Sequence, residues 1–318
     1  MTTTERLNTT HFLRLIRFPN LIIVAFTQFL IQYAVLVPTF TTANLLPALP
    51  PIQFSLFVFS TVIIAATGYI INDILDADID KINQPERLII SKYLSKKRAW
   101  QLYFTLTFIG FIISLYLAFF VKNLPLVFIY PSAISLLAAY SFYLKKMPFW
   151  GNLVVSIFCA FVPGVVLFAE RLTYLQLQST NYQLFTKSTL IIGGYVTFAF
   201  ISTLFREIVK DMEDVEGDLR YDCRTLPIAI GIPKTKWIVI AIGVLFLLIL
   251  VQLATILKFQ KWWLALSFST VFLIIPLLLL LYYLYQSVKP AEFHRVSTGA
   301  KLLMLNGLLL LIILAVLY

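Results

Sequence analysis

The chain has 318 residues, of which 60% are hydrophobic and 13% charged, with a formal net charge of +10. Soluble domains average roughly 45–50% apolar and about 25% charged residues. The composition therefore excludes a water-soluble globular protein, a disordered tail and a nucleic-acid-binding protein. Two cysteines (Cys159, Cys223) and two histidines (His11, His294) are too few for a disulfide framework or a histidine-based metal site.

Nine apolar stretches are long enough to cross a membrane, which takes about 20 residues of helix for roughly 30 Å of hydrocarbon. Prolines inside such spans are tolerated because neighbouring helices can satisfy the freed backbone groups. We therefore predict an all-α polytopic membrane protein and a single domain over residues 1–318. In chain order the expected spans are about 19–39, 54–74, 102–121, 125–144, 149–169, 189–209, 237–257, 262–285 and 300–318.

The basic residues orient these spans. If the N-terminus is cytoplasmic, 20 of the 25 Lys and Arg residues fall in cytoplasmic segments, as the positive-inside rule requires. We therefore expect a protein of the cell (plasma) membrane, with its N-terminus inside and its C-terminus outside. Two long polar segments, about 72–101 and 206–236, are expected to be cytoplasmic loops, and 170–188 an external loop.

The acidic residues are concentrated in two places. Of 15 Asp and Glu residues, five lie between Asp73 and Glu86 and seven between Glu207 and Asp222. Both clusters begin at the cytoplasmic end of an expected span. If the helices continue, residues three, four or seven apart share one face. One face then carries Asn72, Asp76 and Asp80, and another carries Asp211, Asp214 and Asp218.

These two stripes are typical of a site for a hard cation. Oxygen ligands without nearby sulfur or imidazole suit Mg²⁺, which takes a few carboxylates together with phosphate oxygens and water. Basic residues flank both stripes and are suited to binding phosphate. We therefore predict a cradle for a diphosphate. Asp78 and Glu213 fall on the opposite faces of their helices and are poorer candidates.

Two other interpretations of the acids remain open. The carboxylates can be solvated loop residues that balance nearby Lys and Arg. They can also belong to a cation transporter or channel, although transport carboxylates usually lie in mid-helix along a pathway. Here the acids stand at helix ends beside phosphate-type basic residues, which favours the diphosphate site.

At these residues the chain resembles the UbiA superfamily of membrane prenyltransferases. The first match is N72-D-I-L-D76-A-D-I-D80 followed by N83-Q-P-E-R87, and the second is D211-M-E-D214-V-E-G-D218. Supporting pieces are R17-F-P-N20, the run from Tyr140 to Asn152, and Lys301. The resemblance implies nine helices around a central cavity. Leu88 stands where the family usually has proline.

Within the superfamily, the run from Lys210 to Asp218 and the following R224-T-L-P are most similar to digeranylgeranylglyceryl phosphate synthases. That resemblance implies Mg²⁺-dependent transfer of a geranylgeranyl group from a polyprenyl diphosphate donor to geranylgeranylglyceryl phosphate. It also implies that membrane lipids surround the protein. Asp222 replaces a glycine that is frequent there. The alternative acceptor is aromatic, namely a hydroxybenzoate, dihydroxynaphthoate or homogentisate.

The resemblance also assigns roles to individual residues. The metal ligands would be Asn72, Asp76, Asp80, Asp211, Asp214 and Asp218, and the five aspartates would be the catalytic residues. Six residues are expected to bind the substrates, through the diphosphate, an acceptor phosphate or the prenyl cation. They are Asn72, Arg87, Tyr140, Lys145, Lys210 and Arg224.

Overall fold

The structure, a computed structural model, describes residues 7–83, 88–220 and 223–317. Across these ranges the chain is helical, and the one strand-like feature is an isolated bridge between Ile90 and Leu94. This agrees with the predicted all-α class. The helices are α1 (Thr9–Leu15), α2 (Phe18–Leu30), η1 (Ile31–Leu36), α3 (Val37–Thr42), α4 (Pro51–Asn83), α5 (Lys96–Phe120), α6 (Pro125–Phe142), η2 (Leu144–Lys146), α7 (Trp150–Ala169), α8 (Arg171–Thr180), α9 (Tyr182–Glu213), α10 (Val215–Arg220), α11 (Leu226–Ile230), α12 (Ile232–Phe259), α13 (Trp263–Ser269), η3 (Thr270–Ile274), α14 (Ile275–Gln286) and α15 (Pro290–Leu317).

Nine helical stretches in the described part of the chain are long and apolar enough to span a membrane, which confirms the predicted number. The last span begins at Pro290 rather than near residue 300. His294 and Arg295 lower the hydropathy of its first turns, but Phe293 and Val296 are buried in a core and extend the helix. Burial of these two side chains thus sets the start of the helix.

The chain forms two compact units. The first comprises Met1–Phe29, Phe40–Leu144 and Val165–Phe185, and the second Leu30–Thr39, Lys145–Gly164 and Thr186–Tyr318. The first motif belongs to the first unit and the second motif to the second unit. The predicted single domain and central cavity stay predictions.

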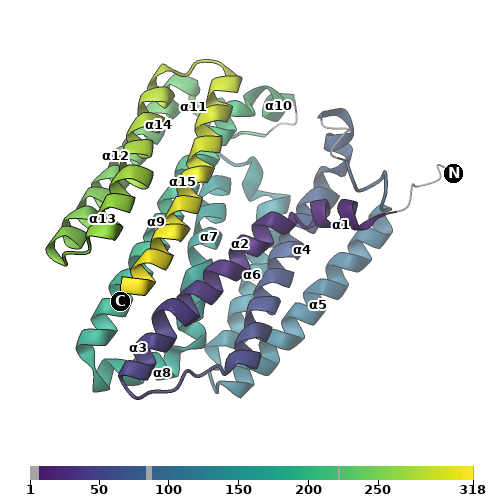
Figure 1. Ribbon diagram of the computed structural model, residues 1–318. Coiled ribbons are helices and arrows are strands. Elements are labelled where there is room, and N and C mark those ends of the chain that lie inside the picture. Colours follow the sequence, from purple (N-terminus) through teal and green to yellow (C-terminus); the bar gives the residue numbers. More distant parts are fainter. Residues whose placement is uncertain (1–6, 84–87, 221–222, 318) are drawn as a thin grey trace. The chain divides into compact units, whose positions relative to one another are not determined.

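In the first unit, α4 packs along α5 and also contacts α6 (Figure 1). Its buried face carries Ile70, Ile74 and Ala77 into a core that also includes Leu15 of α1. The helix therefore has a packed face up to the first acidic motif. This packing explains why α4 continues beyond the expected end of its span, near residue 74, and reaches Asn83.

The segment 170–188, which belongs to the first unit as far as Phe185, differs from the expected external loop. It is helical, because α8 occupies Arg171–Thr180 and α9 already begins at Tyr182. The Glu170 side chain is fully buried and accepts hydrogen bonds from the backbone N–H groups of Ala48 (2.6 Å) and Leu49 (3.2 Å). This carboxylate therefore fastens the connection between α3 and α4 to the start of α8.

In the second unit, α12, α14 and α15 lie side by side (Figure 1). Its cores bury Phe205 of α9, Phe246 of α12 and Phe293 of α15. Close approach of α15 to α9 depends on Gly307, where a Cβ atom would lie 2.1 Å from the Phe198 ring. Small residues at such crossings are typical of membrane helix packing.

Two π-helical segments of the second unit precede prolines. Val37 donates to the carbonyl of Gln32 just before Pro38, and Ile275 donates to that of Thr270 just before Pro276. Proline has no N–H and its ring clashes with the carbonyl four residues earlier. A wider turn accommodates both effects, so the predicted span across Pro276 stays helical.

Candidate active site

The first motif lies on the last turns of α4. The Asn72 amide Nδ2 donates a 2.9 Å hydrogen bond to Oδ2 of Asp76, one turn further along. Both side chains are half-buried. The structure therefore places these two predicted residues on one face of the helix, as their spacing requires.

Neighbouring acids of this motif have other partners. Asp73 forms a 3.5 Å ion pair with Arg17, whose guanidinium also lies 4.7 Å from the centre of the Tyr69 ring. Asp78 is exposed and accepts a 2.5 Å hydrogen bond from Lys96. Asp78 is thus paired with a lysine at the surface, and its prediction as a poorer candidate stays a prediction.

Three further predicted residues belong to the first unit. Tyr140 is half-buried on the last turn of α6. The backbone of Asp80 belongs to α4, but its side chain is not among those that the structure describes. The whole of Arg87 lies outside the described residues. Their predicted roles stay predictions.

The second motif begins at the end of α9. Asp211 accepts a 2.8 Å hydrogen bond at Oδ2 from the Nδ2 amide of Asn152, in the first turn of α7. Asn152 is only 6% exposed. The sequence pattern predicts no role for Asn152. Asn152 is only the last residue of the run from Tyr140 to Asn152. Its pairing with Asp211 could not be predicted, because the two residues lie 59 positions apart and no helical periodicity relates them.

The predicted continuous stripe of the second motif is interrupted. The α9 helix ends at Glu213 and α10 begins at Val215, so Asp214 stands at a break. Helix-type bonds nevertheless continue, because Asp214 N–H donates to Lys210 O and Asp218 N–H donates to Asp214 O, both at 3.0 Å. The chain therefore bends at Asp214 without unwinding.

Asp218 lies on the short helix α10. Its burial, followed by the negative charge of Asp214, raises the pKa of the Asp218 carboxyl to about 6. Lys210 acts in the opposite direction and lies 4.0 Å from the Asp214 carboxylate. The motif therefore brings the negative charge of Asp214 close to the partly buried carboxyl of Asp218, and a bound cation would relieve the repulsion.

Two predicted basic residues of the second unit belong to segments that a backbone hydrogen bond joins. Arg224 is exposed, and its N–H donates a 2.9 Å bond to the carbonyl of Lys146, the residue after Lys145. Lys145 is half-buried in η2. The segment after motif 2 and the segment before α7 are thus joined.

Glu213 and Glu207 have basic partners within the second unit. Glu213 forms a 2.7 Å contact with Nδ1 of His294 on α15. Glu207 pairs with the adjacent Arg206. The contact with His294 joins the end of α9 to α15, and the sequence could not show it because its two residues lie 81 positions apart.

The donor set fits Mg²⁺ when it is shared with other ligands. Among the described residues, no three His, Cys, Asp or Glu side chains gather closely enough to hold a metal by themselves. Each motif instead presents an oxygen ligand in a hydrogen-bonded pair, Asp76 with Asn72 and Asp211 with Asn152. Mg²⁺ typically takes one or two carboxylates, several waters and substrate phosphates.

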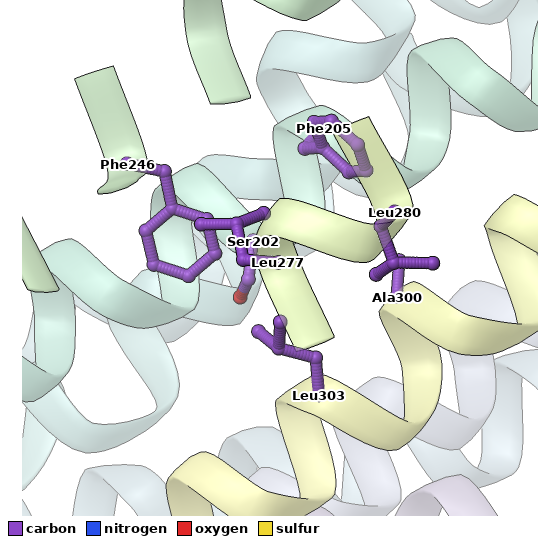
Figure 2. Close-up of a pocket in the computed structure, with 7 residues that line it drawn as sticks. All are labelled: Ser202, Phe205, Phe246, Leu277, Leu280, Ala300 and Leu303. Carbon is purple, nitrogen blue, oxygen red and sulfur yellow. The ribbon is translucent and has the colours of Figure 1, made fainter. Parts of the chain in front are cut away.

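A small cavity inside the second unit does not serve this chemistry. It has no room for a water molecule, and Figure 2 shows aromatic and aliphatic side chains around it together with the single hydroxyl of Ser202. It contains no titratable group that could bind a metal or phosphate. It is lined by Ser202, Phe205, Phe246, Leu277, Leu280, Ala300 and Leu303.

Comparison with known proteins identifies relatives over most of the chain. A family model described as the UbiA prenyltransferase family matches residues 35–315. The digeranylgeranylglyceryl phosphate synthase of Methanosphaera stadtmanae is 30% identical over 261 residues, covering 76% of this chain and 80% of that protein. The synthase of the same name from Sulfurisphaera tokodaii is 34% identical over 196 residues, 59% of this chain. The aligned region spans 61% of the Sulfurisphaera protein's length.

Solved structures show the same fold. One reported for digeranylgeranylglyceryl phosphate synthase in membranes has a TM-score of 0.66 at 23% identity, covering 97% of this chain and 99% of that one. A UbiA homolog from Archaeoglobus fulgidus bound to DMAPP and Mg²⁺ has a TM-score of 0.53 at 15% identity, covering 94% and 98%. At these identities the likeness concerns the fold alone.

Proposed function

Because the chain belongs to the UbiA prenyltransferase family, we propose that it transfers a prenyl group from an allylic polyprenyl diphosphate to a lipophilic acceptor in a Mg²⁺-dependent reaction. It is an integral membrane protein, as its nine apolar helices indicate. We propose further that it lies in the cell membrane with its N-terminus and both motifs on the cytoplasmic side. The acceptor we favour is geranylgeranylglyceryl phosphate.

The observation that carries this proposal is the position of both acidic motifs at the ends of spanning helices. The first motif ends the second span and the second motif ends the sixth. If each span crosses once, even-numbered spans all end on the side where the chain starts. Motifs separated by more than 130 residues of sequence can therefore act on one substrate at one membrane face.

The residues that would hold Mg²⁺ are those of the two stripes. In the first motif Asp76 accepts a hydrogen bond from Asn72, and in the second Asp211 accepts one from Asn152. When bound, Mg²⁺ would neutralise the charge that develops on the diphosphate oxygens as the diphosphate leaves. We propose as ligands Asn72, Asp76, Asp80, Asp211, Asp214 and Asp218.

Basic side chains complete the substrate site in this proposal. Arg87, Lys145, Lys210 and Arg224 bind the diphosphate of the donor or the phosphate of the acceptor, and Tyr140 faces the prenyl cation. In the reaction the bond between the prenyl C1 and the diphosphate oxygen breaks. The acceptor hydroxyl then forms a new C–O bond and loses its proton. An apolar membrane environment favours capture by the acceptor rather than by water.

The choice of acceptor rests on the relatives. Those from Methanosphaera and Sulfurisphaera are named digeranylgeranylglyceryl phosphate synthases, and this chain has the basic residues that a second phosphate needs. An aromatic acceptor, such as a hydroxybenzoate, would need fewer cations. The basic residues that support the ether-lipid acceptor are Lys145, Lys210, Arg220 and Arg224.

A substrate panel tests the proposal. Purified protein is incubated with Mg²⁺ and labelled C10, C15 or C20 diphosphate. The acceptors offered are geranylgeranylglyceryl phosphate, 4-hydroxybenzoate, 1,4-dihydroxy-2-naphthoate and homogentisate. We expect label to move from the C20 donor to the glyceryl phosphate. Transfer to an aromatic acceptor alone would overturn the choice of acceptor and leave the prenyl transfer standing.

The second candidate function, cation transport, is favoured only by the presence of carboxylates in a membrane protein. It predicts ion flux through proteoliposomes without any prenyl substrate. Prenyl transfer without ion flux is the result we expect, and flux without transfer would replace the proposal.

A further inference from the structure

The carboxylate of Asp211 is held from a second helix. Asn152 lies in the first turn of α7 and Asp211 near the end of α9, and the amide Nδ2 of Asn152 donates to Oδ2 of Asp211 at 2.8 Å. Asn152 is buried, with 6% of its surface exposed. This bond therefore restricts the rotation of the Asp211 side chain.

The helix start that carries Asn152 is itself fastened to the second motif. The carbonyl of Lys146 accepts a 2.9 Å bond from the N–H of Arg224, which follows the motif. Asn152 binds Asp211, the first aspartate of the motif. The segment from Lys146 to Asn152 is thus joined at one end to Arg224, beyond the second motif, and at the other end to Asp211 within it.

We propose that Asn152 is a positioning residue for the metal site of the second motif. Its amide engages one oxygen of Asp211 and thereby aims the other oxygen, Oδ1, towards Mg²⁺. This inference rests on the proposed function, because it assumes that Asp211 binds the metal. Residues that hydrogen-bond a metal ligand commonly change affinity or activity by about 10–100-fold when they are removed.

The first motif shows the same relationship within a single helix. Asn72 donates to Asp76 one turn later on α4. The second motif has no asparagine one turn before Asp211, where Glu207 stands instead. Asn152 supplies from α7 the amide that Asn72 supplies within α4. Each motif therefore pairs one aspartate with one amide donor.

A purely structural role for Asn152 makes a different prediction. If the bond only joins α7 to α9, its loss lowers stability and leaves metal affinity unchanged. If it aims Asp211, its loss weakens metal binding even when the protein is folded. The two roles therefore separate when metal binding and thermal unfolding are measured on the same variants.

The matched variants are Asn152→Ala and Ser156→Ala. Ser156 lies one turn further along α7, is fully buried, and donates its hydroxyl to the backbone carbonyl of Asn152 at 2.6 Å. Its loss removes a buried hydrogen bond of α7 without removing the amide donor to Asp211. Asn152→Ser is the second test variant, because its shorter hydroxyl fails to reach Asp211 while it keeps a polar group at the site.

The primary measurement is binding of Mn²⁺, as a substitute for Mg²⁺, by electron paramagnetic resonance of the full-length protein in detergent. We expect Asn152→Ala and Asn152→Ser to raise the Mn²⁺ dissociation constant about 10-fold. Ser156→Ala is expected to leave it within about twofold of the wild type. Unchanged Mn²⁺ affinity in a folded Asn152 variant would overturn the inference.

A double-mutant cycle tests whether Asn152 acts through Asp211. In the background of Asp211→Ala, Asn152→Ala should produce no further change in Mn²⁺ affinity, because the carboxylate that it positions is absent. An equal loss in both backgrounds would contradict the inference. Wild-type protein that shows neither Mn²⁺ binding nor prenyl transfer would instead refute the proposed function.

Discussion

The Nδ2 amide of Asn72 lies 2.9 Å from the Oδ2 oxygen of Asp76. The two residues stand one turn apart on α4, which packs its other face against a core of isoleucine and alanine side chains. The bond uses the amide nitrogen of Asn72, whereas a metal would bind an amide through its oxygen. The observed geometry is therefore compatible with both residues as ligands.

The Glu170 carboxylate is expected to stabilise the first unit. Glu170→Ala leaves the part-buried N–H group of Ala48 and the buried N–H group of Leu49 without their acceptor, which costs about 1–3 kcal/mol. We expect a lower thermal unfolding midpoint in detergent. The neighbouring exposed residue provides the control, as Arg171→Ala should leave the midpoint nearly unchanged. Equal midpoints for the two variants would show that the buried carboxylate contributes nothing.

Gly307 is expected to tolerate no side chain. In Gly307→Ala the new methyl group would lie 2.1 Å from the Phe198 ring, so the ring must move and the core loses packing. Overpacking of this kind typically costs about 1–3 kcal/mol. The matched control is Gly193→Ala, where nothing lies within 4 Å of the added atom. Thermal unfolding should separate the two, and an unaffected Gly307→Ala would contradict the close packing of α9 and α15.

Local features of the fold could be predicted from the sequence. The number of spans follows from apolar runs, and the pairing of Asn72 with Asp76 follows from the helical repeat. Contacts between distant segments could not be predicted in this way. The bonds of Asn152 with Asp211 and of Glu213 with His294 join residues on different helices, and no periodicity in the sequence relates them.

The ends of helices also could not be predicted from the sequence pattern. The break at Asp214 interrupts a spacing that a continuous helix would satisfy. The segment 170–188 is polar enough to suggest a loop, but burial of Thr173 and Leu177 makes α8 a packed helix. In α8, tertiary contacts outweigh the local preference.

The proposed orientation in the membrane can be tested by chemical labelling. In a variant without Cys159 and Cys223, single cysteines are introduced by Ser91→Cys and Ser179→Cys. Ser91 follows the first motif and Ser179 lies on exposed turns of α8. An impermeant thiol reagent applied to sealed cells should label only the second position. Labelling of both positions from outside would contradict the orientation.

The central claim is that the two motifs bind Mg²⁺ for prenyl transfer, and Mg²⁺-dependent turnover of three aspartate variants tests it most directly. Asp78 serves as the control because it is exposed and paired with Lys96, a type of ion pair worth about 0–1 kcal/mol. Transfer from labelled C20 diphosphate is followed over a range of Mg²⁺ concentrations, with EDTA as the metal-free reference. Asp76→Ala and Asp214→Ala should each abolish turnover, while Asp78→Ala keeps most of it. Near-normal turnover of either motif variant at saturating Mg²⁺ would contradict the account.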